Sequence, residues 1–240
     1  METHEAYQVF RGRRNAGTAP ALLTCEHASE RLPPPHRWPE PDLRLLGTHW
    51  THDIGARALS VDLAQALGCV AVMSRFTRLL IDPNRPEEHP EALRTDAGGT
   101  VHLNREVTAE DRLLRVERYH RAYHRAVDLE VKASTAPVLL AVHTFTPLYM
   151  GQRRALEAGV LFDEEEVLAA RLAEALAAER LLVALNEPYS GKEGLVYSVD
   201  RHARAHARRA LEIELRQDLA IMPELRERVV RAVLRALGRG

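Results

Sequence analysis

Cysteine is scarce in this sequence. Cys25 and Cys69 are the only two in 240 residues, and each lies inside an apolar run. Two such residues exclude a framework of several disulfides and argue against a cysteine-based zinc site. We therefore expect two buried, reduced thiols, as is usual in the cytosol.

Long apolar runs and an excess of charge are also absent. No stretch approaches the ~18 consecutive apolar residues of a membrane span, and the polar, acidic N-terminus has no signal-peptide pattern. The 33 lysine and arginine residues balance 34 aspartate and glutamate residues, so the formal net charge is -1. This balance gives no electrostatic reason to expect nucleic acid or an anionic membrane as a partner. The sequence predicts a soluble, cytoplasmic protein whose partner is a small molecule.

Strand-type and helix-type segments alternate along the chain, which is typical of an α/β fold with a sheet covered by helices. The length suits one domain, expected over residues 1–240. Strands are expected at residues 20–25, 69–74, 78–82, 137–143, 159–162, 181–186 and 209–215. Helical periodicity covers residues 53–67, 109–133, 164–178 and 223–237, with Gly68 ending the first helix and Pro223 beginning the last.

Two histidines stand at the ends of expected strands. An apolar run leads into His27, and a second run, rich in leucine and β-branched residues, delivers His143. Each histidine alone would be an ordinary hydrogen-bonded residue. Strand ends in an open α/β sheet meet in one crevice, so the pair together indicates a metal site.

A third metal ligand must come from another element, and Glu30, His49 and Asp53 are the candidates. Glu30 forms a His-x-x-Glu pair with His27, a spacing that lets one turn supply two ligands. Asp53 stands where a helix begins, so it is equally a candidate for a helix cap. Two imidazoles and one carboxylate with an open fourth position are typical of a catalytic zinc site, so we expect one Zn²⁺.

A hydrolase of this kind also needs a carboxylate that accepts a proton from water. In the expected strand 209–215, alternation places Glu212 and Glu214 on one face, opposite three apolar residues. On the edge of a lone sheet these glutamates would form a solvated face. Near a metal, either one could act as the general base.

Two further segments carry residues suited to binding a substrate. Asn84 and Arg85 follow an expected strand, and a guanidinium with an adjacent amide can hold a carboxylate. A surface arginine after a turn is the alternative interpretation. Tyr189 lies in a turn-rich segment after residues 181–186, where we expect it to line the pocket or close over it.

Six segments, in this order along the chain, resemble the N-formylglutamate amidohydrolase family. They are Cys25–Ser29, His52–Ala56, Ser74–Arg75 with Ile81–Arg85, His143–Pro147, Asn186–Gly191 and Glu212–Leu219. The resemblance implies a three-layer α/β/α fold akin to zinc carboxypeptidases, with a mixed central sheet flanked by helices. It also implies one catalytic zinc ion and hydrolysis of a linear carbon–nitrogen amide bond.

Carried over by position, the resemblance implies that His27 and His143 bind the zinc and that Glu214 is the general base. Asn84 and Arg85 look like the pair that holds the substrate carboxylate. The resemblance favours Asp53 as the third ligand and leaves Glu30 as the alternative.

These expectations lead to a zinc-dependent amidohydrolase that cleaves the amide bond of a small N-acyl amino acid, such as N-formyl-L-glutamate. One alternative is a carboxypeptidase-like metallopeptidase, which would prefer unblocked peptides and a longer cleft. Another is a non-catalytic metal- or ligand-binding domain on the same scaffold, because a fold does not fix a function.

Overall fold

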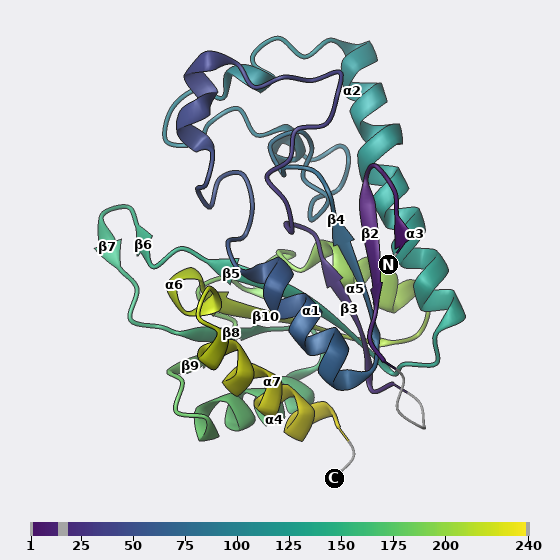
Figure 1. Ribbon diagram of the computed structural model, residues 1–240, viewed down its shortest axis with the longest axis vertical. Coiled ribbons are helices and arrows are strands. Elements are labelled where there is room, and N and C mark those ends of the chain that lie inside the picture. Colours follow the sequence, from purple (N-terminus) through teal and green to yellow (C-terminus); the bar gives the residue numbers. More distant parts are fainter. Residues whose placement is uncertain (1, 14–18, 239–240) are drawn as a thin grey trace.

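The structure is a computed structural model that describes residues 2–13 and 19–238, so the expected domain of residues 1–240 extends slightly beyond the described residues. Within them, one mixed sheet has the strand order β1-β2-β4-β3-β5-β10-β8-β9 (Figure 1). Its strands are β1 Glu2–Thr3, β2 Tyr7–Arg11, β3 Ala21–Cys25, β4 Val70–Ser74, β5 Val138–Phe145, β8 Ala158–Leu161, β9 Val183–Leu185 and β10 Arg209–Arg216. A separate hairpin pairs β6 Leu148–Tyr149 with β7 Gln152–Arg153.

The centre of the sheet is parallel. Strand β3 pairs in parallel with β4 and β5, and β5 pairs in parallel with β10. Antiparallel pairs follow on both sides, β2 with β4 and β8 with β10. Every residue of β3 and β5 is buried, as their unbroken apolar runs predict for strands covered on both faces.

Helices cover both faces of the sheet, so the expected three-layer α/β/α fold is confirmed. Helices α1 Ala56–Leu67, α4 Glu166–Ala178 and α7 Pro223–Leu237 pack on one face, while α3 Arg121–Ala133 and α5 Tyr197–Ala205 pack on the other. Figure 1 shows α1 and α7 side by side in front of the central strands. The shorter elements are α2 Ala109–Arg115, α6 Gln217–Ala220, the π-helical segment η4 Val116–His120, and the 3₁₀ segments η1 Glu40–Leu45, η2 Pro90–Leu93, η3 His102–Asn104 and η5 Gly191–Glu193.

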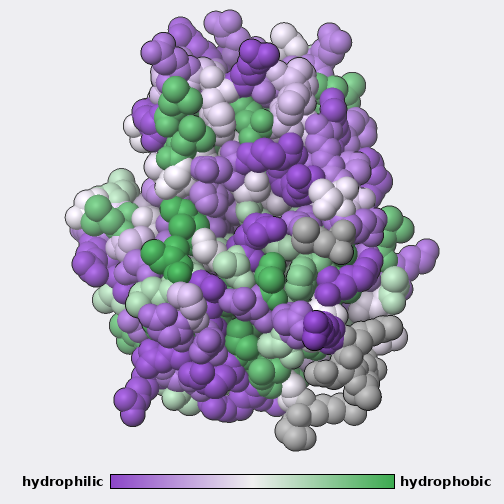
Figure 2. Space-filling view, viewed as in Figure 1, coloured by the Kyte–Doolittle hydropathy of each residue, from purple (hydrophilic) through white to green (hydrophobic). Residues whose placement is uncertain are grey.

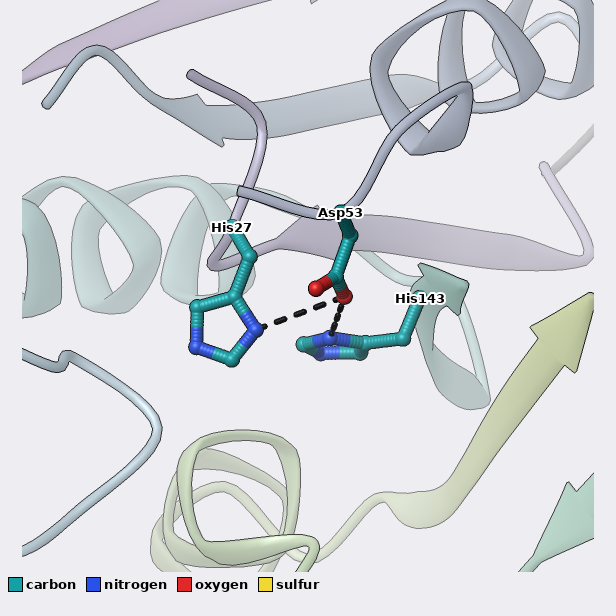
Figure 3. Close-up of side chains that lie close together, drawn as sticks. All are labelled: His27, Asp53 and His143. Carbon is teal, nitrogen blue, oxygen red and sulfur yellow. Dashed lines mark hydrogen bonds and ion pairs between the residues drawn. The ribbon is translucent and has the colours of Figure 1, made fainter. Parts of the chain in front are cut away.

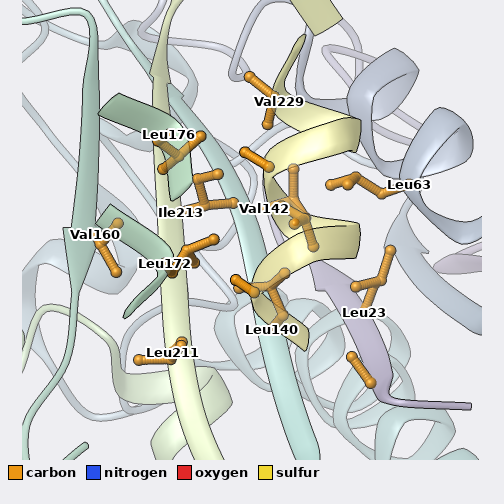
Figure 4. Close-up of a cluster of buried hydrophobic side chains, with 14 of the residues drawn as sticks. Leu23, Leu63, Leu140, Val142, Val160, Leu172, Leu176, Leu211, Ile213 and Val229 are labelled. Atoms are coloured by element: carbon orange, nitrogen blue, oxygen red, sulfur yellow. The ribbon is translucent and has the colours of Figure 1, made fainter. Parts of the chain in front are cut away.

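The larger core lies between the central strands and α1, α4 and α7. Figure 4 shows Val142 of β5 and Ile213 of β10 beside Leu172 and Leu176 of α4 and Val229 of α7. All five side chains are buried without measurable exposure. This packing holds the central strands rigidly, and the functional side chains stand at the strand ends.

Long connecting segments gather at the carboxyl ends of β3 and β4 (Figure 1). The segment after β3 leads through Asp53 to α1, and a left-handed Gly55, with φ of 89°, caps that helix. A Cβ at residue 55 would lie 2.6 Å from the Cβ of Ala220, so glycine is needed both for the conformation and for the close approach to α6.

Several expected boundaries were wrong. Residues 78–82 form a turn followed by irregular backbone and do not pair in the sheet. Leu79 is buried among the connecting segments, while Leu80 and Ile81 are buried against the face of the sheet that α3 covers. The first helix begins at residue 56, the expected helix 109–133 is interrupted by the π-helical segment, and residues 181–186 shrink to β9. Strands β1, β2, β6 and β7 were missed, since their short, polar or mixed sequences carry little periodic signal.

The surface is mixed in polarity. In the view of Figure 2, hydrophobic residues form separate patches among hydrophilic ones. Among the described helices, none has the length and apolar character needed to cross a membrane. Cys25 and Cys69 are both buried and unpaired, as expected.

The central core provides a test of stability. Ile213→Ala should lower the free energy of unfolding by about 2–5 kcal/mol, because β10 is covered on both sides and cannot collapse around the cavity. Leu129→Ala is the control, since that side chain is 67% exposed on α3 and should change stability by less than about 0.5 kcal/mol. Urea unfolding of both variants measures the difference, and equal midpoints would contradict this account of the core.

Candidate active site

Three side chains meet at the carboxyl ends of the central strands (Figure 3). His27 follows β3 by two residues, His143 lies in the last part of β5, and Asp53 precedes α1. The backbone N–H of Asp53 donates to the carbonyl of His27 at 2.9 Å, which ties the segment before α1 to the end of β3. The structure thus brings together residues that are 26 and 90 positions apart in the sequence.

The geometry of this group suits a metal ion. One ligand atom from each of His27, Asp53 and His143 lies within 4.8 Å of the others, and all three residues are buried. Nδ1 of His143 is 2.8 Å from Oδ2 of Asp53, and Nδ1 of His27 is 3.4 Å from the same oxygen. The two imidazole rings stand edge to face, with their centroids 4.8 Å apart.

The other nitrogen of each ring contacts a second carboxylate. Nε2 of His27 lies 2.7 Å from Oδ1 of Asp82, and Nε2 of His143 lies 3.0 Å from Oε2 of Glu26. Metal-binding histidines usually donate their second N–H to a carboxylate in this way, which fixes the tautomer and the ring orientation. Glu26 is fully buried and also accepts a hydrogen bond of 3.0 Å from the hydroxyl of Tyr123.

This arrangement leaves a need for positive charge. If each neutral ring directs its proton from Nε2 to its carboxylate, the Nδ1 lone pairs of His27 and His143 both face the same oxygen of Asp53. Three lone pairs directed at one point repel each other unless a cation lies among them. The donor set, two imidazole nitrogens and a carboxylate oxygen, fits a divalent transition-metal ion such as Zn²⁺.

The pKa directions describe the same charge imbalance. Burial alone would lower the pKa of His143, but the surrounding carboxylates of Glu212, Asp53 and Glu26 raise it well above its usual value. Burial opposes ionisation of Glu26, yet its hydrogen bond to His143 brings the pKa to about 2. Burial also opposes ionisation of Asp53, and the two histidines nevertheless lower its pKa. The site therefore attracts a cation, whether a proton or a metal ion.

The other two candidate third ligands lie outside this group. The Glu30 carboxylate accepts a hydrogen bond of 2.7 Å from the backbone N–H of Gly47 and lies 3.8 Å from His52, at the exposed side of the segment after β3. The backbone after His27 turns away from the site, so the His-x-x-Glu spacing does not bring Glu30 back to it. His49 lines the pocket beside Trp50 without joining the group.

Both glutamates of β10 face the same pocket. In the parallel register, Glu214 lies beside His143, and Glu212 lies two residues further from the strand end. One carboxylate oxygen of each, Oε2, is buried with no hydrogen-bond partner among the described residues. Burial raises the pKa of Glu212 to about 7, and burial together with the charge of Glu212 raises that of Glu214 well above its usual value. Unpaired buried oxygens of this kind are typical of a site that binds water, substrate or metal.

The pocket over these residues has a volume of about 180 Å³ and is lined by Asn84, Arg85 and Tyr189, as well as by the histidines and glutamates. Arg85 forms no salt bridge with any described residue, so its guanidinium is available to an anion. Asn84 is more constrained, because its amide nitrogen donates to the carbonyl of Leu195 at 3.2 Å and its oxygen accepts from the N–H of Ser198 at 3.0 Å. The Asn84 side chain therefore ties this wall of the pocket to the start of α5.

An arginine that the sequence did not single out stands beside the pocket. The Arg154 guanidinium lies over three aromatic rings that line it, at 4.6 Å from the ring centre of Tyr149, 5.3 Å from Tyr189 and 5.6 Å from Phe145. Its N–H also contacts the Tyr189 hydroxyl at 3.3 Å. Tyr189 thus lies at the pocket wall, held by a cation–π contact to Arg154, which directly follows β7.

Sequence reasoning also missed the charged residues behind the histidines. Arg78 pairs with Asp82 at 2.8 Å and with Asp53 at 3.5 Å, so it is a partly buried counter-charge of the site. Glu26 and Asp82 lie inside the family-like segments Cys25–Ser29 and Ile81–Arg85, but neither was assigned a role. Only the tertiary contacts reveal that they hold the imidazole rings.

The chain is similar to known proteins in both sequence and structure. Residues 19–221 match the family model described as N-formylglutamate amidohydrolase. A gene product from Agrobacterium tumefaciens has a similar structure, with a TM-score of 0.84, 27% identity, and coverage of 98% of this chain and 94% of that chain. The N-formylglutamate amidohydrolase from Ralstonia eutropha has a TM-score of 0.72 and 18% identity over 97% of both chains, which shows a shared fold.

A metallo-carboxypeptidase from Burkholderia cenocepacia is more distant, with 14% identity and a TM-score of 0.40 over 96% of this chain and 63% of that chain. Among curated proteins, no match to the sequence is found.

The carboxylates behind the histidines provide a test of metal binding. Asp82→Asn should weaken zinc affinity about 10- to 100-fold, because a neutral amide no longer holds the N–H of His27 as a carboxylate does. Asp111→Asn is a closely matched control, since Asp111 also contacts a histidine, His36 at 2.9 Å, and an arginine four residues away. Competition against a chromophoric chelator measures both affinities. Equal zinc affinity in the two variants would contradict the assigned role of Asp82.

Proposed function

The chain belongs to the N-formylglutamate amidohydrolase family, and from this membership we propose that it hydrolyses the amide bond of a small N-acyl amino acid, with N-formyl-L-glutamate the first substrate to test. Family membership supports a hydrolase acting on amides. The zinc ion and the N-acyl amino acid are our proposal, and one observation carries them. Two buried glutamates, each with a carboxylate oxygen that has no hydrogen-bond partner among the described residues, face the same pocket as the His27, Asp53 and His143 group.

In this proposal the pocket residues bind and orient the substrate. Arg85 pairs with the substrate carboxylate, because its guanidinium is otherwise without a salt bridge to the described residues and a planar fork matches a carboxylate. Asn84 positions this segment through its two hydrogen bonds to the chain before and within α5. Tyr189 also lines the pocket, with its ring fixed by Arg154.

The metal ligands are His27, Asp53 and His143. A zinc ion held by them would polarise the amide carbonyl, acidify a water molecule and favour the ionised form of nearby carboxylates. Asp82 and Glu26 keep both imidazole rings in the Nε2–H tautomer, so that each Nδ1 presents a lone pair to the site.

Glu214 is the proposed general base. It lies beside His143 in the sheet register and nearer than Glu212 to the carboxyl end of β10. Its unpaired Oε2 accepts a proton from water and passes that proton to the departing amine nitrogen. The water-poor surroundings that raise its pKa also make proton transfer back to the leaving group favourable.

The alternative functions are separated by substrate tests. A cavity of about 180 Å³ suits a small acyl amino acid better than an extended peptide. Purified protein should contain one zinc ion per chain, hydrolyse N-acyl amino acids in preference to unblocked dipeptides, and lose activity on chelation and regain it with zinc. Preference for unblocked peptides would support the metallopeptidase. Zinc binding with no hydrolysis of either class would support a non-catalytic ligand-binding domain.

Replacing the proposed base tests the chemical step. Glu214→Gln nearly preserves the shape of the side chain but removes the proton acceptor. We expect zinc content to be retained and kcat to fall about 10²- to 10⁴-fold. Steady-state kinetics on zinc-loaded protein, with metal content measured on the same sample, gives the result.

Glu212→Gln is the matched comparison, since it makes the same exchange two residues away on the same face of β10. Glu212 should affect kcat less, because it lies deeper, 3.8 Å from Nε2 of His143. Near-normal turnover by zinc-loaded Glu214→Gln protein would remove Glu214 as the base. A loss confined to Glu212→Gln would move the base two residues upstream.

Arg85 tests the recognition of the substrate carboxylate. Arg85→Lys keeps the positive charge but loses the bidentate geometry, so KM should rise about 10-fold while zinc content stays unchanged. Arg105→Lys is the control, because Arg105 is exposed and outside the pocket lining. An unchanged KM for acidic substrates in Arg85→Lys would exclude Arg85 as the carboxylate anchor.

A further inference from the structure

A second group of histidines lies behind the pocket wall, on the opposite face of the sheet from α1 and α7. His120 ends the π-helical segment, His124 follows one turn later in α3, and His202 lies in α5. All three are buried. Their rings follow one another in a column of tilted contacts, with centroids 4.5 Å apart between His120 and His124 and 5.1 Å apart between His124 and His202.

Two of these histidines hold the segment that carries Arg85. Nε2 of His120 lies 2.8 Å from the backbone carbonyl of Arg85, and Nε2 of His124 lies 3.0 Å from that of Pro83. A carbonyl oxygen only accepts hydrogen bonds, so each histidine carries a proton on Nε2. The two bonded carbonyls flank Asn84, and together the histidines fix the backbone of the carboxylate-binding segment from behind.

His124 continues into a chain of hydrogen bonds. Its Nδ1 lies 2.8 Å from Nε2 of His202, and Nδ1 of His202 lies 3.0 Å from Oδ1 of Asp128. Asp128 also accepts a hydrogen bond of 2.9 Å from His206, and its pKa is lowered by these histidines although partial burial opposes it. Asp128 is therefore an acceptor, and Nδ1 of His202 carries a proton.

Two neutral imidazoles carry too few protons for the contacts along this chain. Three contacts link the Pro83 carbonyl, His124, His202 and Asp128, and both ends of the chain can only accept. Two neutral imidazoles supply two protons, so the third contact would set two lone pairs against each other at 2.8 Å. A complete chain requires one additional proton on the His124–His202 pair.

The surroundings of the pair both lower and raise the pKa values of its two histidines. Burial lowers the pKa of His124 well below its usual value and also lowers that of His202, while Asp128 raises the pKa of His202. Titratable and charged groups surround the pair on several elements. The helix of residues 116–133 contributes His120, Arg121, Tyr123, Arg125 and Asp128, and α5 with its end contributes Tyr197, Arg201 and His206. Glu26 lies on the sheet side, and Asp82, Glu87 and Glu88 lie near the bonded carbonyls.

We propose that the His124–His202 pair is a proton-dependent positioning element, which holds the Pro83–Arg85 segment in place for substrate binding while the pair carries one additional proton. The effect on substrate rests on the proposed function, because Arg85 must bind the substrate carboxylate. The effect on the segment itself does not depend on it. Loss of the proton at higher pH breaks one contact in the chain, loosens the hold on Pro83 and raises KM.

The direction of the pH effect follows from the burial of the pair. Because burial lowers both pKa values, the proton is lost at a pH below the usual histidine value of about 6.5. KM for an N-acyl amino acid should therefore be lowest at mildly acidic pH and rise about 5-fold across this step, as expected for one hydrogen bond. The effect should appear in KM more than in kcat, because neither histidine touches the pocket.

His202→Gln separates the proton from the hydrogen bond. A glutamine amide can donate to Nδ1 of His124 without carrying charge, so this variant should keep a low KM and lose the pH step. His206→Gln is the matched control, because His206 bonds the same carboxylate but has no contact with His124. It should leave the KM step unchanged. An identical step in wild-type and His202→Gln protein would overturn the proton-dependent part of the proposal.

His124→Leu tests the hold on the segment without any substrate. Hydrogen–deuterium exchange of the peptide spanning residues 80–88 should be faster in this variant than in wild-type protein, with the exchange of β5 unchanged. In wild-type protein, the same peptide should exchange faster above the pH step than expected from chemistry alone. Unchanged exchange in a folded His124→Leu protein would overturn the positioning role. If exchange changes as expected but no N-acyl amino acid is hydrolysed, the proposed function fails and the positioning role stands.

Discussion

Five buried carboxyl groups surround two imidazole rings at one end of the sheet, and their mutual repulsion is the constraint that shapes the rest of the site. They belong to Glu26, Asp53, Asp82, Glu212 and Glu214. Two carboxylates about 4 Å apart repel by about 4 kcal/mol in surroundings of moderate polarity, so such a cluster needs positive charge nearby. One guanidinium, that of Arg78, supplies part of it. The remaining negative charge lies where the two Nδ1 atoms meet Asp53, which is why a divalent ion fits there.

The fixed register of the sheet determines where these groups lie. The parallel register sets Glu214 beside His143, and the all-buried strands on either side leave no freedom to slide. The large core on one face of the sheet therefore supports the chemistry on the strand ends. A polar cluster this costly is tolerated because the apolar layers stabilise the strands that carry it.

The proposed substrate carboxylate site lies on a segment without regular structure, which the surrounding elements hold from several sides. The Asn84 side chain ties it to α5, and His120 and His124 bond its carbonyls from the helix behind. A loop held in this way can present Arg85 without the entropy loss that ordering a free loop would cost. The π-helical segment ends at His120 and thus sets where the histidine column begins.

The sequence by itself determined the fold class, the central strands and most helices, because their apolar periodicity is strong and local. It also singled out His27 and His143, since strand ends are visible in one dimension, whereas Asp53 was preferred over Glu30 and His49 only through the family resemblance. Tertiary structure decided what depends on distant contacts. The Glu30 carboxylate binds the backbone of Gly47 and lies away from the two histidines, and Arg154 packs against three aromatic rings that line the pocket. It also kept residues 78–82 out of the sheet, because Leu79 is buried among the connecting segments and Leu80 and Ile81 against a sheet face, which buries the apolar run without strand pairing. Periodicity records which face of an element is buried, and only the folded chain determines what covers it.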